Sequence, residues 1–562
     1  MKRIIYFILC AILVAGAGCK KTFLERLPQD VLVDQSYWAN ESNVRTFAYG
    51  FYTAYFGGYG SSFTFGRYFS GQSLNDDFAP SSPAQFTKVV PSSGGGWTFA
   101  WVRKTNIFIN RVQSAPLTDE VKNHWTGIGR FFRAMEYSDL VQRFGDVPWF
   151  GKELTDASEE LYKPRDPRTQ VMDSVLADFN YAAENVRVAD GTAGLTVNRY
   201  VVLAFMSRVF LYEGTFLKYH NLDQAKATKY LEAAKWAAEQ VIASGKYSMT
   251  DNYRSVFNSL DLAGKKEVIL YRQYTEGIVM HSLHSYVNKE PQTGASKDAI
   301  DTYLAEDGLP ISISPLYQGD STIAKVMTDR DPRITETFVP VLRLNGVATN
   351  YSTSGYAVLK FYNDAVKDVA AGNSNTNTTD APVIRYGEVL LNYAEAVAEL
   401  GTLTQADLDK SINMLRSRPG IGMPKLQVMG AQPAVNGVVY DDPERDPTVP
   451  SKIWEIRRER RVELMMEGFR LDDLKRWKKL EYTDTQGNAD INRGAWIRRA
   501  DYPGLKDVVI ENNAAEGYII PAWRPESQRN FTDPKVYLEP LPLDQIKLYA
   551  DQGKELRQNP GW

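Results

Sequence analysis

The sequence predicts a mostly α-helical protein in which a scaffold of paired, tetratricopeptide-like helical hairpins carries a second, irregular lobe rich in loops with a few short strands. Three observations indicate this fold class. Apolar residues recur at helical spacing over several long segments, small residues lie where paired helices would face each other, and the intervening stretches are rich in Gly, Pro, Ser and Asp. We expect the scaffold to draw on about 36–260 and 380–480, and the lobe on about 57–97, 265–370, 425–450 and 490–535.

The first residues have the pattern of a lipoprotein signal peptide. A basic start and an apolar run over 4–14 precede small residues and then Cys19. This run is too short to cross a bilayer, which needs about 20 residues, but it suits a secretory signal. We therefore predict a signal peptide over 1–18 and a lipid anchor on Cys19. Gly16 departs from the larger aliphatic residue usual three positions before the cysteine, and ordinary cleavage leaving a free thiol is the alternative.

Eight segments have the apolar periodicity of scaffold helices. In 118–144, Asp119 and Glu120 lie where acidic residues favour a helix N-terminus, and Gly145 followed by Pro148 ends the helix. Alanines along 223–244 would allow close packing against a neighbouring helix. The predicted helices span 36–56, 101–112, 118–144, 167–186, 198–216, 223–244, 386–400 and 405–418. A strand is predicted at 267–274 and a long loop at 429–450.

A long stretch over 57–96 interleaves aromatic residues with Gly, Ser and Pro. A loop of this length is usually functional or disordered, and its many aromatic residues argue against disorder. Aromatic residues make up 12% of the chain, which is consistent either with core packing or with a surface that stacks on flat ligands. Sugars present apolar faces and hydroxyl rims, which suit aromatic platforms beside amide, carboxylate and arginine groups. The predicted ligand-binding residues are Arg67, Tyr68, Asp76, Asp77 and Trp97, with Tyr286 from an insert at 278–296.

The stretch 451–479 has an unusual charge pattern. Glu455, Glu459, Glu463 and Glu467 stand four apart and would form one column on a helix. Like charges at this spacing destabilise an isolated helix by roughly 0.2–0.5 kcal/mol per pair, so we expect cationic partners elsewhere in the fold. Gly468 suits a helix end, and a second apolar stripe follows it. We interpret the stretch as a buried, charge-laced helical hairpin that locks distant parts of the chain together.

The same stretch resembles the C-terminal signature of the SusD/RagB family of Bacteroidetes outer-membrane nutrient-binding lipoproteins. Stretches 23–28, 330–333 and 558–562 also resemble that family, so the likeness runs from about residue 19 to the end. The resemblance implies a SusD-like fold. The residues that carry the structural signature are Glu459, Arg460, Arg461, Glu463, Glu467, Gly468, Arg470, Asp473, Arg476 and Trp477.

Other kinds of site have weak support. With 65 basic and 68 acidic residues, nothing suggests nucleic acid as a partner. His281 and His284 have metal-like spacing, but zinc takes three or four ligands, so we expect no metal and no cofactor. The glutamate column lacks the Glu-x-x-His pattern of di-iron bundles. Asp76-Asp77 and Glu159-Glu160 could act as glycosidase acids, which work about 5–10 Å apart, but adjacent acids in a loop are usually solvated.

The resemblance therefore implies a binding protein and no enzyme. Such a protein would be lipid-anchored in the outer membrane, would face the cell exterior, and would hand oligosaccharides without cleaving them to a SusC-like TonB-dependent transporter over which it closes like a lid. Relatives often place a stacking aromatic at the position of Trp97. Lys20-Lys21 departs from the acidic residues that often follow the cysteine in surface-exported relatives. The alternatives are capture of peptides or protein fragments by the same lid mechanism, and an exported helical glycoside hydrolase.

Overall fold

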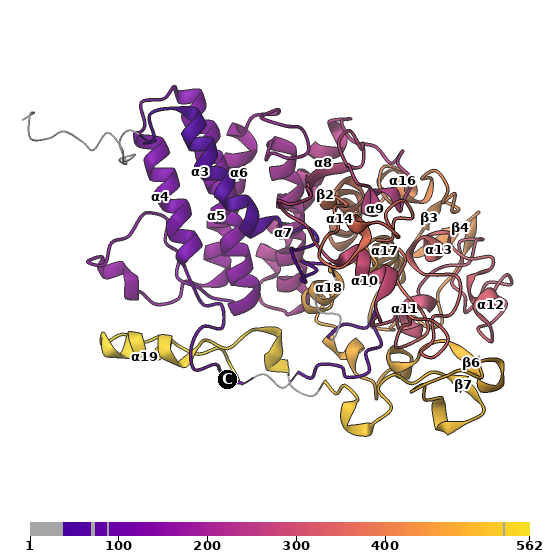
Figure 1. Cartoon of the computed structure of the whole chain (residues 1–562). Helices are drawn as coiled ribbons and strands as arrows, with labels where there is room; N and C mark the ends of the chain where they lie inside the picture. The colour runs from indigo at the N-terminus through magenta and orange to yellow at the C-terminus, as the bar shows by residue number, and fades with distance from the viewer. Residues whose placement is uncertain (1–36, 69–73, 87–88, 532–533) are drawn as a thin grey trace, which may run out of the picture.

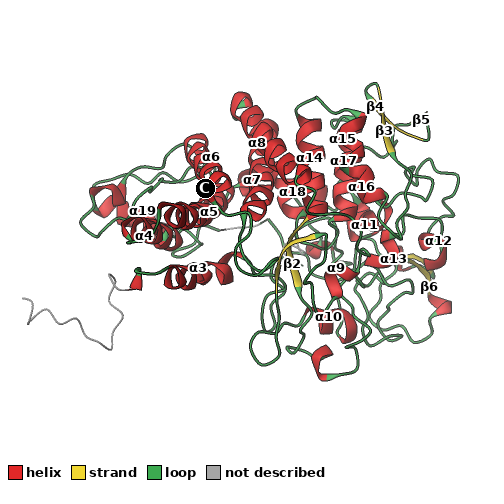
Figure 2. Cartoon of the chain, turned by 90° about the horizontal axis from the view of Figure 1, so that it is seen from above, coloured by secondary structure: helices red, strands yellow, loops and turns green. Residues whose placement is uncertain are grey.

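The computed structural model describes residues 37–68, 74–86, 89–531 and 534–562. The predicted signal peptide, Cys19 and the family-like stretch 23–28 lie outside these residues. Helices form most of the regular structure and the strands are short, which confirms the predicted fold class (Figure 2).

The helical scaffold is a row of helices that pack on their neighbours in the chain (Figure 1). The predicted helices up to residue 244 and the one at 386–400 are confirmed within a few residues of their expected ends. Thr118 caps one of them by accepting a hydrogen bond from the Val121 amide. The helices are α3 (Glu41–Tyr55), α4 (Ala100–Ser114), α5 (Asp119–Phe144), α6 (Arg168–Asn185), α7 (Arg199–Tyr219), α8 (Gln224–Ala243) and α14 (Tyr386–Glu399).

Helix α7 lies at the centre of this scaffold. It has the length and hydropathy of a membrane span, but 89% of its apolar window is buried among α5, α6, α8 and α14. A helix that is apolar on all sides suits the core of a large protein. Gly214 permits close contact with α8, since a Cβ there would lie 3.0 Å from the Leu231 nitrogen. Buried alanines on α8 complete this contact, as the sequence predicts.

The loop-rich lobe contains short elements. Strand β1 (Val268–Arg272), predicted at 267–274, pairs antiparallel with the distant β2 (Ala381–Arg385). Its short helices are α9 (Ser255–Asn258), α10 (Leu283–Lys289), α11 (Lys297–Asp301), α12 (Ile323–Met327) and α13 (Arg333–Thr337). Strands β6 (Trp496–Arg498) and β7 (Glu516–Tyr518) form a ribbon at the end of the molecule opposite α19 (Leu543–Asp551), as both views show (Figures 1 and 2).

Two predicted segments differ from the structure. The helix expected over 405–418 is divided into α15 (Gln405–Asp409) and α16 (Ile412–Arg416), because the backbone leaves the helical conformation at Ser411, with φ −137° and ψ −96°. Asn413, inside α16, exchanges two hydrogen bonds with the backbone of Leu426. The loop expected over 429–450 instead contributes to a sheet of β3 (Leu426–Met429), β4 (Gln432–Val435) and β5 (Val438–Val439). The sheet consists of two hairpins with two-residue loops, Gly430-Ala431 and Asn436-Gly437, and the second of these is a dipeptide typical of tight hairpin turns.

The charged stretch joins two hydrophobic cores. It forms α17 (Ser451–Glu463) and α18 (Arg470–Arg476), so the first helix ends before Gly468. Leu464 packs into the core of the helical scaffold, whereas Val462, Met465 and Met466 pack into the core of the lobe. The segment between the two helices therefore lies at the junction of the two halves of the molecule.

Candidate functional site

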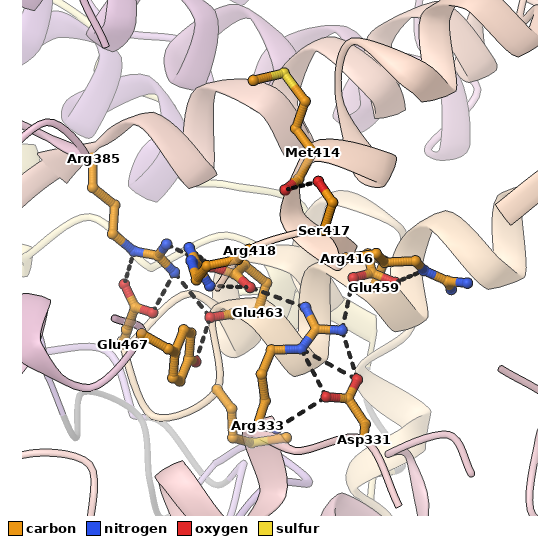
Figure 3. A network of polar contacts seen from close by, with 12 residues as sticks. Asp331, Arg333, Arg385, Met414, Arg416, Ser417, Arg418, Glu459, Glu463 and Glu467 are labelled. Carbon is orange, nitrogen blue, oxygen red and sulfur yellow. Dashed lines mark hydrogen bonds and ion pairs between the residues drawn. The ribbon is translucent and has the colours of Figure 1, made fainter. Parts of the chain in front are cut away.

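The glutamate column is buried and ion-paired, with three members on α17 and the fourth, Glu467, in the turn after it. Figure 3 shows Glu459, Glu463 and Glu467. The Glu463 carboxylate accepts from Arg385 Nη1 at 2.7 Å, Arg418 Nη2 at 2.8 Å and Arg333 Nη1 at 2.9 Å. These arginines come from β2, from the residues after α16, and from α13. Glu267 lies 2.8 Å from both Arg385 and Arg418. The prediction of cationic partners for the column is therefore confirmed at Glu463.

The neighbouring members of the column have partners of the same kind. Glu459 pairs with Arg333 and Arg416, each at 2.8 Å. Glu467 pairs with Lys360 at 2.8 Å and Arg385 at 2.7 Å. Glu455 differs, because its partner Arg458 lies one turn along the same helix. The column thus connects this stretch with segments that are 43 to 130 residues away in the chain.

Burial and charge act in opposite directions at these carboxylates. Burial alone would raise the pKa of Glu463, but the charges of Arg418, Arg385 and Arg333 outweigh it and hold the pKa well below the ordinary value. At Glu267, burial dominates and raises the pKa, to which the charge of Glu463 adds. Burial lowers the pKa of the Lys360 ammonium group to about 8, although Glu467 opposes this shift. The junction is a closed ionic network with a structural role.

Asp76 and Asp77 belong to this structural network. Arg470 Nε lies 2.7 Å from Asp76, and Arg461 Nε lies 2.8 Å from Asp77. Burial would raise the pKa of Asp76, but Arg461 and Arg470 lower it to about 2, while burial raises the pKa of Asp77. The expectation that these acids are solvated is wrong, because the signature arginines bury and pair them. They fix the 57–96 loop to the α17–α18 hairpin.

Two aromatic rings of the predicted site are buried as well. Trp97 is 6% exposed and packs edge-on against Phe99 and Phe144 in the scaffold core. Tyr68 is 5% exposed, and its hydroxyl donates to the Pro382 carbonyl at 2.6 Å. Neither ring therefore forms the exposed stacking platform that we predict. Trp97 packs in the core of the scaffold and Tyr68 in the core of the lobe. Tyr68 also lines a cavity described below, so its part in ligand binding stays a prediction.

Two predicted residues remain, Arg67 in the 57–68 loop and Tyr286 in the insert, and part of this loop is exposed to solvent. Residues 57–68 contact the 278–296 insert: the Ser62 amide donates to the Met280 carbonyl at 3.0 Å, and the Phe65 ring centroid lies 4.8 Å from that of Tyr286. Phe63, two residues before Phe65, is 68% exposed. The structure therefore brings the loop and the insert together, with an aromatic ring exposed at the loop tip.

Arg67 and Tyr68 of the same loop line a second feature, a hollow that we call the polar groove. It consists of two adjoining cavities of about 120 and 330 Å³ that share Tyr55, Arg67, Met135, Arg208 and Phe469. The exposed Arg67 side chain lies 4.7 Å from the Phe469 ring centroid and 2.6 Å from Asp472. Gly468 allows this arrangement, because it has a φ of +80° and a Cβ there would lie 1.9 Å from the Arg67 carbonyl oxygen.

Helix α5 supplies the polar wall of the groove. Glu136, Asp139 and Gln142 line it, and Glu136 accepts a hydrogen bond from the Tyr55 hydroxyl at 2.7 Å. Burial raises the pKa of Glu136. These residues are not among those predicted from the sequence, because their helices have the periodicity of core helices. Glu136, Asp139 and Gln142 are spaced three apart on α5, and this polar stripe beside the apolar one was the sequence feature that could have indicated them.

The two histidines with metal-like spacing are used in local contacts. His281 Nε2 lies 2.9 Å from the Thr379 carbonyl oxygen, and Nδ1 accepts from the Leu283 amide at 3.1 Å. His284 Nε2 lies 3.0 Å from the Asn363 carbonyl oxygen. Within the described parts of the chain, no group of three or more His, Cys, Asp or Glu residues is placed to hold a metal ion.

Comparison with known proteins places the chain in a family. A family model described as the SusD family matches residues 266–562, which is more than half of the chain. SusD-like protein P38 of Formosa agariphila is 24% identical over 486 residues, which is 82% of this chain and 88% of that protein. A SusD-like carbohydrate binding protein from Bacteroides fragilis superposes with a TM-score of 0.65 at 21% identity, covering 91% of this chain and 99% of the other. Surface glycan-binding protein A from Bacteroides fluxus gives a TM-score of 0.57 at 17% identity, covering 93% and 100%. The chain belongs to the SusD family.

Proposed function

We propose that this protein binds oligosaccharides at the polar groove and the neighbouring 57–68 loop without cleaving them. It passes them to a SusC-like TonB-dependent transporter of the outer membrane, where a lipid on Cys19 holds it facing the cell exterior. Two of the similar solved proteins are named for binding carbohydrate or glycan, which supports a sugar as the ligand.

The composition of the polar groove is the observation that carries this proposal. Tyr55, which is half-buried, offers aromatic surface, Arg67 offers a guanidinium group at the mouth, and Glu136 and Gln142 offer carboxylate and amide groups. Hydroxyl-rich ligands need this combination, because their apolar faces pack on rings while their rims exchange hydrogen bonds. The groove volume falls within the range of small-molecule sites.

A glycoside hydrolase is the second candidate, and one observation favours it. Glu136, whose pKa burial raises, lines the groove one turn of α5 from Asp139. Hydrolases place their two carboxyl groups on opposite sides of the scissile bond. Two residues three apart on one helix point to the same side, so we prefer binding. Glu159 and Glu160 do not line this groove; they are exposed in a short 3₁₀ turn.

Electrophoresis of the soluble form lacking residues 1–19 through gels that contain polysaccharide tests the proposal. We expect retarded migration and no release of reducing sugar. Arg67→Ala should weaken retention about tenfold or more, since hydrogen bonds to charged groups contribute about 1.5–3 kcal/mol. Arg557→Ala removes a comparable exposed ion pair, with Glu555, and should leave retention unchanged. Release of reducing ends that Glu136→Gln abolishes would establish the hydrolase instead.

A further inference from the structure

A second hollow lies in the C-terminal part of the lobe, beside β6 and β7. Its volume is about 440 Å³, and residues between 485 and 528 line it. It shares no lining residue with the polar groove. We call it the Trp523 hollow, after the aromatic residue at its wall.

Trp523 is an exposed ring on a fixed backbone. Its side chain is 52% exposed. The preceding residue, Ala522, exchanges two hydrogen bonds with the Asn492 side chain, at 3.0 and 3.1 Å. The Arg524 guanidinium carbon lies 5.0 Å from the ring centroid. Because the hydrogen bonds of Ala522 fix the backbone next to the ring, a ligand that covers the ring loses less binding energy to ordering this segment.

Amide groups gather around the same hollow. Asn512 and Asn513 are exposed and have φ values of 55° and 52°, a conformation that Asn tolerates better than most residues. Backbone strain of this kind concentrates at ligand sites. No hydrogen bond from another protein group occupies the side-chain amides of Asn512, Asn513 or Gln528 among the residues that the structure covers. Each amide can both donate to and accept from a hydroxyl group.

The charges at the hollow cancel. Arg493 is its cationic lining residue and Glu511 its anionic one, and their side chains pair at 2.6 Å. Arg493 also lies 2.9 Å from Asp490. The guanidinium group is thus already neutralised, and an anionic ligand would gain little from it. A ring, several amides and a neutral interior suit an uncharged ligand rich in hydroxyl groups.

We propose that the Trp523 hollow is a second carbohydrate site, which takes one or two units of a neutral glycan. Trp523 stacks on the apolar face of a sugar, while Asn512, Asn513 and Gln528 exchange hydrogen bonds with its hydroxyl groups. This inference rests on the proposed function for the choice of a sugar as ligand, but it concerns a separate site. A long glycan that occupies both sites is held with an affinity above that of either site, since the second contact is intramolecular.

Titration calorimetry of the soluble chain with short neutral oligosaccharides tests this proposal. We expect two sites in the wild type and one in Trp523→Ala, with affinity for a long neutral polysaccharide reduced at least about tenfold, as for a desolvated aromatic anchor. Trp523→Phe should retain both sites. Trp236→Ala is the matched control, because Trp236 is 44% exposed on α8 and lines neither the polar groove nor the Trp523 hollow, and it should behave as the wild type.

The outcomes separate the two proposals. Unchanged binding by Trp523→Ala, together with loss of sugar binding in Arg67→Ala, overturns the second site and leaves the polar groove. Loss in Trp523→Ala with full binding in Arg67→Ala supports the hollow and contradicts the groove. A wild type that binds no neutral glycan overturns both, and a preference of the hollow for acidic over neutral oligosaccharides overturns its assigned ligand class.

Discussion

At the scale of single residues, Glu463 shows why the signature stretch can bury so many charges. Its carboxylate contacts three guanidinium groups from distant segments, which Glu267, Glu459 and Glu467 also help to neutralise, and Glu463 and its three arginines are each almost fully buried. Replacing one member of such a set is costly, because the remaining charges stay buried without a partner.

Glu463→Ala should therefore lower the free energy of unfolding by about 3–5 kcal/mol. Urea denaturation measures this loss. The matched control is Glu516→Ala, which removes an exposed pair with Arg498 and should cost about 1 kcal/mol or less. Equal urea midpoints for the two variants would contradict the structural role of Glu463.

His281 makes stability depend on pH. Burial lowers the pKa of His281 to about 3, whereas an unfolded histidine titrates near 6.5. Below pH 6.5, His281 is protonated in the unfolded chain but stays neutral in the folded protein, so acidification favours unfolding. Relative to His281→Gln, the wild type should lose about 1.4 kcal/mol of stability per pH unit between about pH 6 and 4. Denaturation series at several pH values measure this difference, and parallel curves would contradict the assignment.

At the scale of elements, sequence periodicity predicted the elements that are determined locally. Helices such as α5 and α8 carry a complete apolar face and their own end signals. The break between α15 and α16 lies at Ser411, where the backbone is not helical, and no glycine or proline in 405–418 marks it. Likewise, Trp97 and Trp523 both lie in irregular segments, and only the tertiary fold buries one and exposes the other. The sequence therefore predicted which loops carry aromatic residues but could not predict which rings face solvent.

The turn between α17 and α18 provides a test at this scale. Gly468→Ala should destabilise the protein, because its Cβ would meet the Arg67 carbonyl oxygen at 1.9 Å in addition to the strain of a positive φ. Gly437→Ala is the matched control, with a φ of +79° and open space around the Cβ. We expect Gly437→Ala to cost about 1 kcal/mol and Gly468→Ala clearly more. Thermal unfolding measures both losses of stability. Equal losses in the two variants would contradict the close contact between Gly468 and the 57–68 loop.

At the scale of the whole molecule, two cores meet at one ionic junction. The polar groove borders this junction, because Arg385 and Glu467 line it, whereas neither residue lines the Trp523 hollow. The predicted anchor would fix one end of this body to a membrane. Cys19→Ala should move the protein from the membrane fraction to the soluble fraction, because several acyl chains hold a protein stably whereas a bare chain end does not. Fractionation of cells that express the two forms measures this, and retention in the membrane would count against the lipid.

The central claim is that this SusD-family chain holds glycans and leaves their bonds intact. Incubation of the soluble chain with a polysaccharide panel, followed on the same samples by gel retardation and by reducing-end measurement, tests it most directly. We predict retardation by at least one neutral polysaccharide with no increase in reducing ends. Reducing ends that accumulate with time, or free migration through every polysaccharide in the panel, would contradict it.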